Sequence, residues 1–76
     1  MDYKQRIESN YEVMLGKPVI KGTRITVEII LKKLAGGFSV EEILSAYDHL
    51  KKEDIYAAIE YAACVIADEE TIEPVK

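Results

Sequence analysis

The chain has 76 residues and one cysteine; 49% of its residues are hydrophobic, 32% are charged, and its formal net charge is −4. These values predict one folded domain with a small core, and they exclude an internal disulfide and a structural zinc held by Cys and His. No apolar run approaches the roughly 20 residues of a membrane span. We therefore expect a cytoplasmic protein that has no metal, no cofactor and no membrane anchor.

The charge is distributed unevenly along the chain. Residues 53–76 carry seven acidic side chains and one basic one, whereas residues 17–33 carry five basic side chains and one acidic one. A local basic surface on an acidic protein can steer an anionic partner toward it. The alternative is that these lysines are ordinary solvated side chains.

The first 26 residues are predicted to form a short β-arm. The candidate strand runs are 11–15, 18–20 and 24–27. Pro18 places its run at an edge or in a turn, because it lacks the N–H that a central strand donates. Strands this short leave unpaired edges, so we predict that the arm completes its hydrogen bonds with a second subunit in a homodimer.

Residues 16–27, GKPVIKGTRITV, place two glycines around a basic segment. A phosphate-binding P-loop is excluded, because five residues rather than four separate Gly16 from Gly22, and Thr23 follows without a lysine. The spacing fails a dinucleotide fingerprint as well. We predict instead a structural clasp that turns at Gly22 and packs on the following helix. Its residues are Gly16, Pro18, Ile20, Gly22 and Thr23.

Residues 27–68 are predicted to form three helices, because the hydrophobic period changes to about 3.6 after Thr26. Thr26 can cap the first helix, and Gly36-Gly37 ends it. Ser39 and Glu42 form a capping box that starts a short second helix.

The third helix is predicted over residues 52–68, with acidic residues in its first turn. Its inner face is expected to contain Ile55, Ile59, Ala62 and Ile66. Residues 1–68 then form a single domain, and residues 69–76 form a frayed tail.

A short helix, a turn and a longer helix, with another helix packed across them, form the tri-helical arrangement of helix-turn-helix domains. Residues 11–63 also resemble a small bacterial and archaeal family, domain of unknown function 433, on the stretch GKPVIKGTRITVEIILKKLAGGFSVEEILSAYDHLKKEDIYAAIEYA. The family's hallmark is Gly-Lys-Pro-x-Ile-x-Gly-Thr-Arg followed by three helices. The resemblance implies a mainly α, homeodomain-like fold with a short N-terminal β-arm or hairpin, and a role as the antitoxin of a PIN-like nuclease. The chain departs from the family where Lys51 and Lys52 replace the usual Thr or Ser before Glu53-Asp54.

The helix-turn-helix fold suggests that the third helix reads DNA, but its side chains argue against this. The expected outward residues are Glu53, Asp54, Tyr56, Ala57 and Glu60. Three of the five are acidic and oppose a polyanion. The candidate DNA or phosphate contacts are therefore Lys17, Lys21, Arg24, Lys32, Lys33, Lys51 and Lys52.

Several of these residues have a structural alternative. For Arg24 we favour an ion pair with Glu28, or with a carboxylate of the later helices, over a phosphate contact. His49 is interpreted as a turn residue and Cys64 as a packing residue, since no set of acid, base and nucleophile stands out.

The sequence predicts a regulatory binding module rather than an enzyme. We expect an antitoxin that neutralises a PIN-like nuclease, with its own promoter DNA as a further ligand. The candidate protein-partner surface is Glu53, Tyr56 and Glu60. The alternative is a stand-alone DNA-binding transcriptional regulator with a helix-turn-helix fold.

Overall fold

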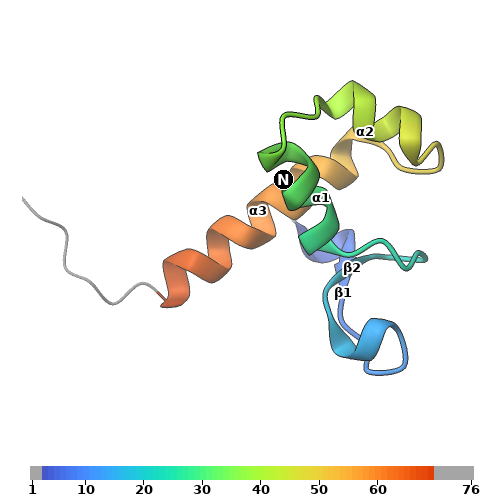
Figure 1. The fold of residues 1–76 in the computed structure, drawn as a ribbon. Helices are drawn as coiled ribbons and strands as arrows, with labels where there is room; N and C mark the ends of the chain where they lie inside the picture. The colour runs from blue at the N-terminus through green and yellow to red at the C-terminus, as the bar shows by residue number, and fades with distance from the viewer. Residues whose placement is uncertain (1–2, 70–76) are drawn as a thin grey trace, which may run out of the picture.

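The computed structural model describes residues 3–69, which form three helices and a short N-terminal hairpin (Figure 1). The helices are α1 (Val27–Ala35), α2 (Val40–Ala46) and α3 (Lys52–Glu69), and the strands are β1 (Ile7–Glu8) and β2 (Val19–Ile20). Two 3₁₀ turns, η1 (Tyr3–Gln5) and η2 (Met14–Gly16), complete the N-terminal region. The predicted fold class, three helices with a short N-terminal hairpin, is confirmed. The predicted tail comprises residues 69–76; α3 extends one residue into it, to Glu69, and residues 70–76 lie outside the described residues.

The ends of the helices lie where the local signals predict them. The N–H of Ile29 donates to the Thr26 hydroxyl over 3.0 Å at the start of α1. After α1, Gly37 has φ +99°, and the N–H of Phe38 reaches back to the Lys33 carbonyl, which completes a Schellman motif.

The capping box before α2 is also present. The Ser39 N–H donates to the Glu42 side chain over 2.8 Å, and the Glu42 N–H donates to the Ser39 hydroxyl over 3.1 Å. Because each of these motifs is formed by residues within six positions, the sequence is sufficient to place them.

The strand predicted over residues 11–15 is wrong. Met14 and Leu15 have φ values of +54° and +57°, a left-handed conformation that no β-strand contains. The strand that pairs with β2 is instead β1, and Ile7 lies opposite Ile20 in an antiparallel register. On its other side, β2 forms a bridge from Val19 to Thr26, so the described chain supplies both neighbours of β2. Pairing of the arm between two subunits stays a prediction.

The segment predicted as a clasp turns tightly between β2 and α1. Gly22 has φ +78°, and the Thr23 hydroxyl donates to the Ile20 carbonyl over 2.8 Å while accepting from the Ile25 N–H over 3.0 Å. Ile20 is 3% exposed and belongs to the same hydrophobic cluster as Val27. These contacts attach the turn to the start of α1.

The core draws side chains from every helix and from both strands. Its cluster contains Ile7, Ile20, Val27, Ile30, Ile43, Leu50, Ile55, Ala57 and Ala58. Of the four residues expected on the inner face of α3, only Ile55 is buried, while Ile59 is 42% and Ile66 is 64% exposed. The expected rotation of α3 is therefore wrong.

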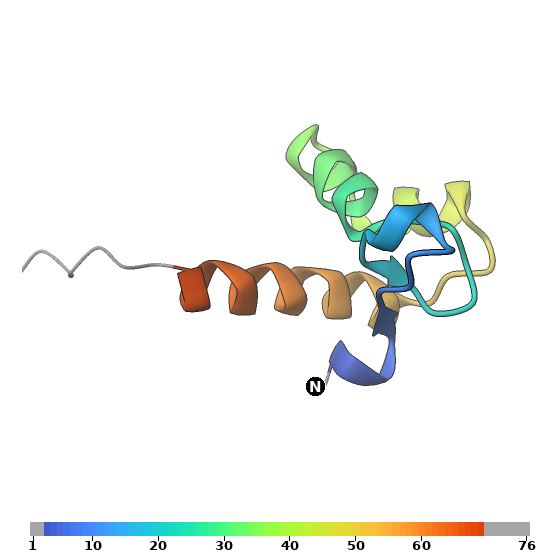
Figure 2. The ribbon, with the colours of Figure 1, turned by 90° about the horizontal axis from the view of Figure 1, so that it is seen from below.

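The two ends of α3 lie in different surroundings. The first turns of α3 lie among the other helices and the hairpin, whereas its last turns project beyond them (Figures 1 and 2). Within residues 3–69, no helix combines the length and the apolar character needed to cross a membrane.

Candidate interaction surfaces

An ion pair ties the start of α3 to the N-terminal region. The Arg6 guanidinium lies 2.9 Å from one carboxylate oxygen of Asp54, and the other oxygen accepts the Lys51 N–H over 2.9 Å. Asp54 is 7% exposed, so the expectation that it faces outward is wrong, as it is for Ala57, which is fully buried. Asp54 caps α3 from inside the helix, where Lys51 supplies no capping hydroxyl.

Sequence reasoning did not identify Arg6 as a structural residue. Its partner is 48 positions away, and no local pattern connects them. Asp54 did give a signal, since it occupies the third position of α3, where a side chain can reach back to the N-cap N–H.

Four of the seven candidate phosphate contacts are exposed and form no ion pair within residues 3–69. These are Lys21, Arg24, Lys51 and Lys52. Lys21 and Lys51 line the same cavity of about 190 Å³, together with Arg6 and His49. Arg24 lies on an adjoining hollow that shares His49. We call Lys21, Arg24, Lys51 and Lys52 the basic edge.

The other three candidates interact with side chains of their own chain. Lys32 and Lys17 lie 3.2 Å and 3.4 Å from the two carboxylate oxygens of Glu28. Hydrogen bonds from Lys32 and then Lys17 hold the pKa of Glu28 below its ordinary value of 4.5. The Lys33 ammonium lies 4.9 Å from the centre of the Phe38 ring, a cation–π contact.

The favoured ion pair of Arg24 with Glu28 or a carboxylate of the later helices is wrong. Glu28 is already paired with two lysines, and Asp54 is paired with Arg6. Arg24 is exposed and takes part in none of the ion pairs of the described residues. Its charge is therefore available to an external anion.

The predicted protein-partner surface lies along one side of α3. Glu53 is exposed, Tyr56 is 45% exposed, and Glu60 is half-buried. One carboxylate oxygen of Glu60 is shielded from solvent and accepts no hydrogen bond within residues 3–69. Ile59 lies between Tyr56 and Glu60 in sequence and is 42% exposed, so the surface combines apolar area with two carboxylates.

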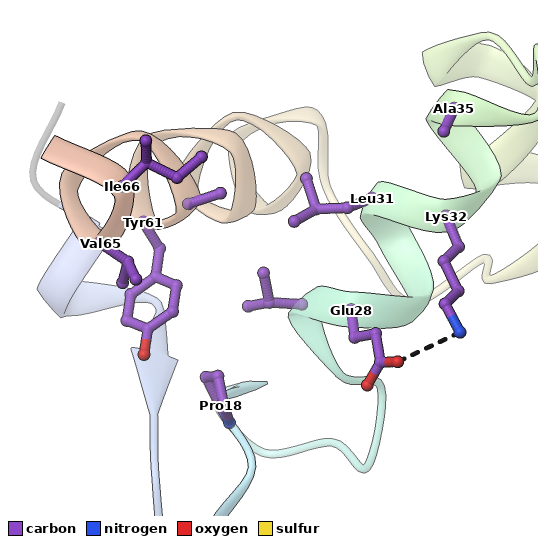
Figure 3. Close-up of a pocket in the computed structure, with 10 residues that line it drawn as sticks. Pro18, Glu28, Leu31, Lys32, Ala35, Tyr61, Val65 and Ile66 are labelled. Atoms are coloured by element: carbon purple, nitrogen blue, oxygen red, sulfur yellow. Dashed lines mark ion pairs between the residues drawn. The ribbon is translucent and has the colours of Figure 1, made fainter. Parts of the chain in front are cut away.

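A separate apolar groove lies between α1 and the projecting end of α3, with a volume of about 490 Å³ (Figure 3). It is lined by Pro18, Val27, Glu28, Leu31, Lys32, Ala35, Tyr61, Ala62, Val65 and Ile66. In Figure 3, Leu31 points from α1 into the space between the helices, and Tyr61 extends from α3 toward the end where Pro18 lies. Sequence reasoning missed this groove because it assigned Ile66 to the core.

Comparison with known proteins identifies the family. The model of the family described as "Protein of unknown function (DUF433)" matches residues 7–62. The chain belongs to the DUF433 family. The match covers the hairpin, the basic edge and the first half of α3, and it ends within the part of α3 that borders the groove.

The chain is also similar to a curated protein whose function is not described. "Uncharacterized protein y4eO" of Sinorhizobium fredii is 36% identical over 59 residues, which make up 78% of this chain. The DUF433 chain spans only 27% of that relative's length. No solved structure matches the chain.

Proposed function

We propose that this DUF433 protein is an antitoxin that binds a PIN-like nuclease through the outward side of α3. The surface consists of Glu53, Tyr56, Ile59 and Glu60. The observation that carries the proposal is that half-exposed apolar side chains stand beside carboxylates on a helix that the core holds in place. Aromatic and aliphatic anchors of this kind supply affinity, and flanking charges select the partner.

The charges favour a basic partner. Glu53 and Glu60 flank Tyr56 and Ile59, and neither carboxylate forms an ion pair within residues 3–69. One carboxylate oxygen of Glu60 is shielded by the protein's own atoms and lacks a hydrogen bond, so the side chain gains a partner if it turns outward to a lysine or arginine of the nuclease. Acidic side chains could also cover the cationic surface with which a nuclease binds RNA.

The test is co-expression with PIN-like nucleases, taken first from open reading frames beside this gene. We expect the two proteins to co-purify and RNA cleavage to fall as the antitoxin is titrated in. Glu60→Lys should weaken binding by about tenfold or more, since a central charge reversal adds repulsion to a lost pair.

Glu41→Lys is the matched control, because Glu41 is exposed on α2 and its reversal changes the net charge equally. Both variants should melt like the wild type. Normal binding by Glu60→Lys, or equal loss in both variants, would contradict this surface.

A DNA-binding regulator is the second candidate function, and the basic edge favours it. Its cations come from the clasp turn and from the start of α3, and none of them forms an ion pair with a carboxylate of the described residues. Exposed lysines and arginines of this kind contact phosphates and release counterions.

The measurement is fluorescence anisotropy with duplex DNA from the protein's own promoter. We expect affinity to fall steeply as salt rises, and Lys21→Glu with Arg24→Glu to weaken binding equally for all sequences. Lys17→Glu is the control, since Lys17 pairs with Glu28. Absence of binding at low salt would exclude this second function.

A further inference from the structure

The groove between α1 and residues 61–69 has no cover within the described chain. Ile66, on its α3 wall, is 64% exposed, and Ala35, on its α1 wall, is exposed. Tyr61, Ala62 and Val65 are each only partly buried. A continuous apolar hollow of about 490 Å³ is a large exposed apolar surface for so small a protein, and such surfaces mark interaction sites.

We propose that a second copy of this chain fills the groove, with residues 61–69 of each copy lying in the groove of the other. The proposal does not depend on the nuclease or on DNA, because it uses a different part of α3. It also replaces the hairpin with the helices as the main interface of the homodimer.

The charge at the rim of the groove is opposite to the charge at the end of α3. The rim of the groove carries Lys32 and, through its contact with Glu28, Lys17, so two cations stand beside one anion. The end of α3 is acidic, since Asp68 is exposed there without an ion pair among the described residues. The negative end of the helix dipole adds to this charge. An acidic, apolar helix end therefore matches an apolar groove with a basic rim.

In a two-fold dimer, a single interface covers both the groove and the projecting end of α3. Tyr61, Ala62, Val65 and Ile66 form one wall of the groove. Beyond Tyr61, which packs against Tyr3, this helix end projects from the rest of the described chain (Figure 2). In an isologous dimer the helix end of each copy inserts into the groove of the other, so both walls of each groove are covered. A small core gains stability from such burial.

The nuclease surface is a poorer site for a second copy. Glu53 and Glu60 flank it, so two copies meeting there would place carboxylates against carboxylates. The groove offers less of this repulsion, because its one lining carboxylate, Glu28, is already paired with two lysines.

The test is sedimentation velocity of the full chain from about 1 to 300 µM, with the melting temperature of each variant measured in parallel. We expect the wild type to approach twice the chain mass of 8.6 kDa as concentration rises. Ile66→Lys and Ala35→Arg, one on each wall, should raise the dimer Kd by about tenfold or more. Both positions are exposed, so both variants should keep the wild-type melting behaviour measured at the lowest concentration.

Ile29→Lys is the matched control. Ile29 is 37% exposed on α1 but does not line the groove, so its replacement should leave the dimer intact. A wild type that stays monomeric at 300 µM overturns the proposal. A dimer that survives both wall variants, or that weakens equally in Ile29→Lys, overturns it too and returns the hairpin as the candidate interface.

Discussion

The two halves of α3 belong to one helix but differ in what surrounds them. In residues 52–60, Asp54, Ile55, Ala57 and Ala58 are buried, and an ion pair attaches the helix to Arg6. In residues 61–68 no side chain is fully buried, and Ile66 is largely exposed. The first half therefore belongs to the folding unit. In the second half Tyr61 packs against Tyr3 and the edge of the core, while the turns that follow it are available for binding.

The largest expected difference between the halves comes from their aspartates. Asp54→Ala should lower the free energy of unfolding by about 2–3 kcal/mol, because it removes a helix cap and leaves Arg6 without its partner. The half-exposed Arg6 can regain water, which keeps the loss below that of a fully buried pair. Asp68→Ala, on the second half, should change stability by less than about 0.5 kcal/mol. Urea unfolding measures the free energy of unfolding of both variants. Equal losses would contradict the difference between the two halves of α3.

Alanines give a second matched pair. Ala58 is fully buried, so Ala58→Leu should overpack the core and cost about 1–3 kcal/mol. Ala63 is exposed, so Ala63→Leu should leave stability unchanged within about 0.5 kcal/mol. Thermal unfolding at low concentration compares the two, and a larger loss from the Ala63 variant would contradict the observed rotation of α3.

Two glycine substitutions test whether the turn of the clasp contributes to the stability of the folding unit that contains the first half of α3. Gly22→Ala should cost about 1 kcal/mol, because φ +78° strains any residue with a Cβ, although the added Cβ meets no atom within 4 Å. Gly36→Ala should cost less, since Gly36 has φ −81° and its Cβ would lie 3.4 Å from the Lys32 carbonyl. Urea unfolding compares the free energies of unfolding of the two variants. Equal values would show that the positive φ at Gly22 does not strain a residue with a Cβ.

The smallest expected effect is at Glu28, on the rim of the groove. Its pKa lies below 4.5 because Lys32 and Lys17 stabilise the carboxylate, so the folded state binds its proton less readily than the unfolded chain does. The stabilisation is present above the unfolded pKa and is lost as pH falls through the lower folded value. NMR titration should show the low pKa in the wild type, and Lys32→Met should return it toward 4.5. An unchanged pKa in that variant would mean that Lys32 does not cause the shift.

Local signals explain why the helix boundaries could be predicted from the sequence. Thr26, Ser39 and Gly37 each act on backbone groups only a few residues away. The rotation of α3 could not be predicted in the same way, because apolar residues occur on all its sides. Ile59 and Ile66 continue the spacing of Ile55, yet the core selects Ala57 and Ala58, whose small side chains admit close helix packing.

The basic edge and the groove depend on contacts between residues that are far apart in the sequence, and sequence spacing does not reveal such contacts. The sequence identified the basic residues, but the structure divides them into the exposed basic edge and three lysines occupied by Glu28 or Phe38. The pairing of Ile7 with Ile20 and of Arg6 with Asp54 joins distant positions. The groove depends in turn on where α1 crosses α3, which only the packed core determines.

Amide hydrogen exchange along α3 tests the central difference between its halves most directly. At about 1 µM, we expect slow exchange in residues 55–60 and fast exchange in residues 63–69, because only the first half is braced by the core. At a few hundred micromolar, exchange in residues 63–69 should slow as the second copy covers them, with little change in the first half. Equally slow exchange in both halves at the low concentration, or fast exchange in the second half at both concentrations, would contradict the account.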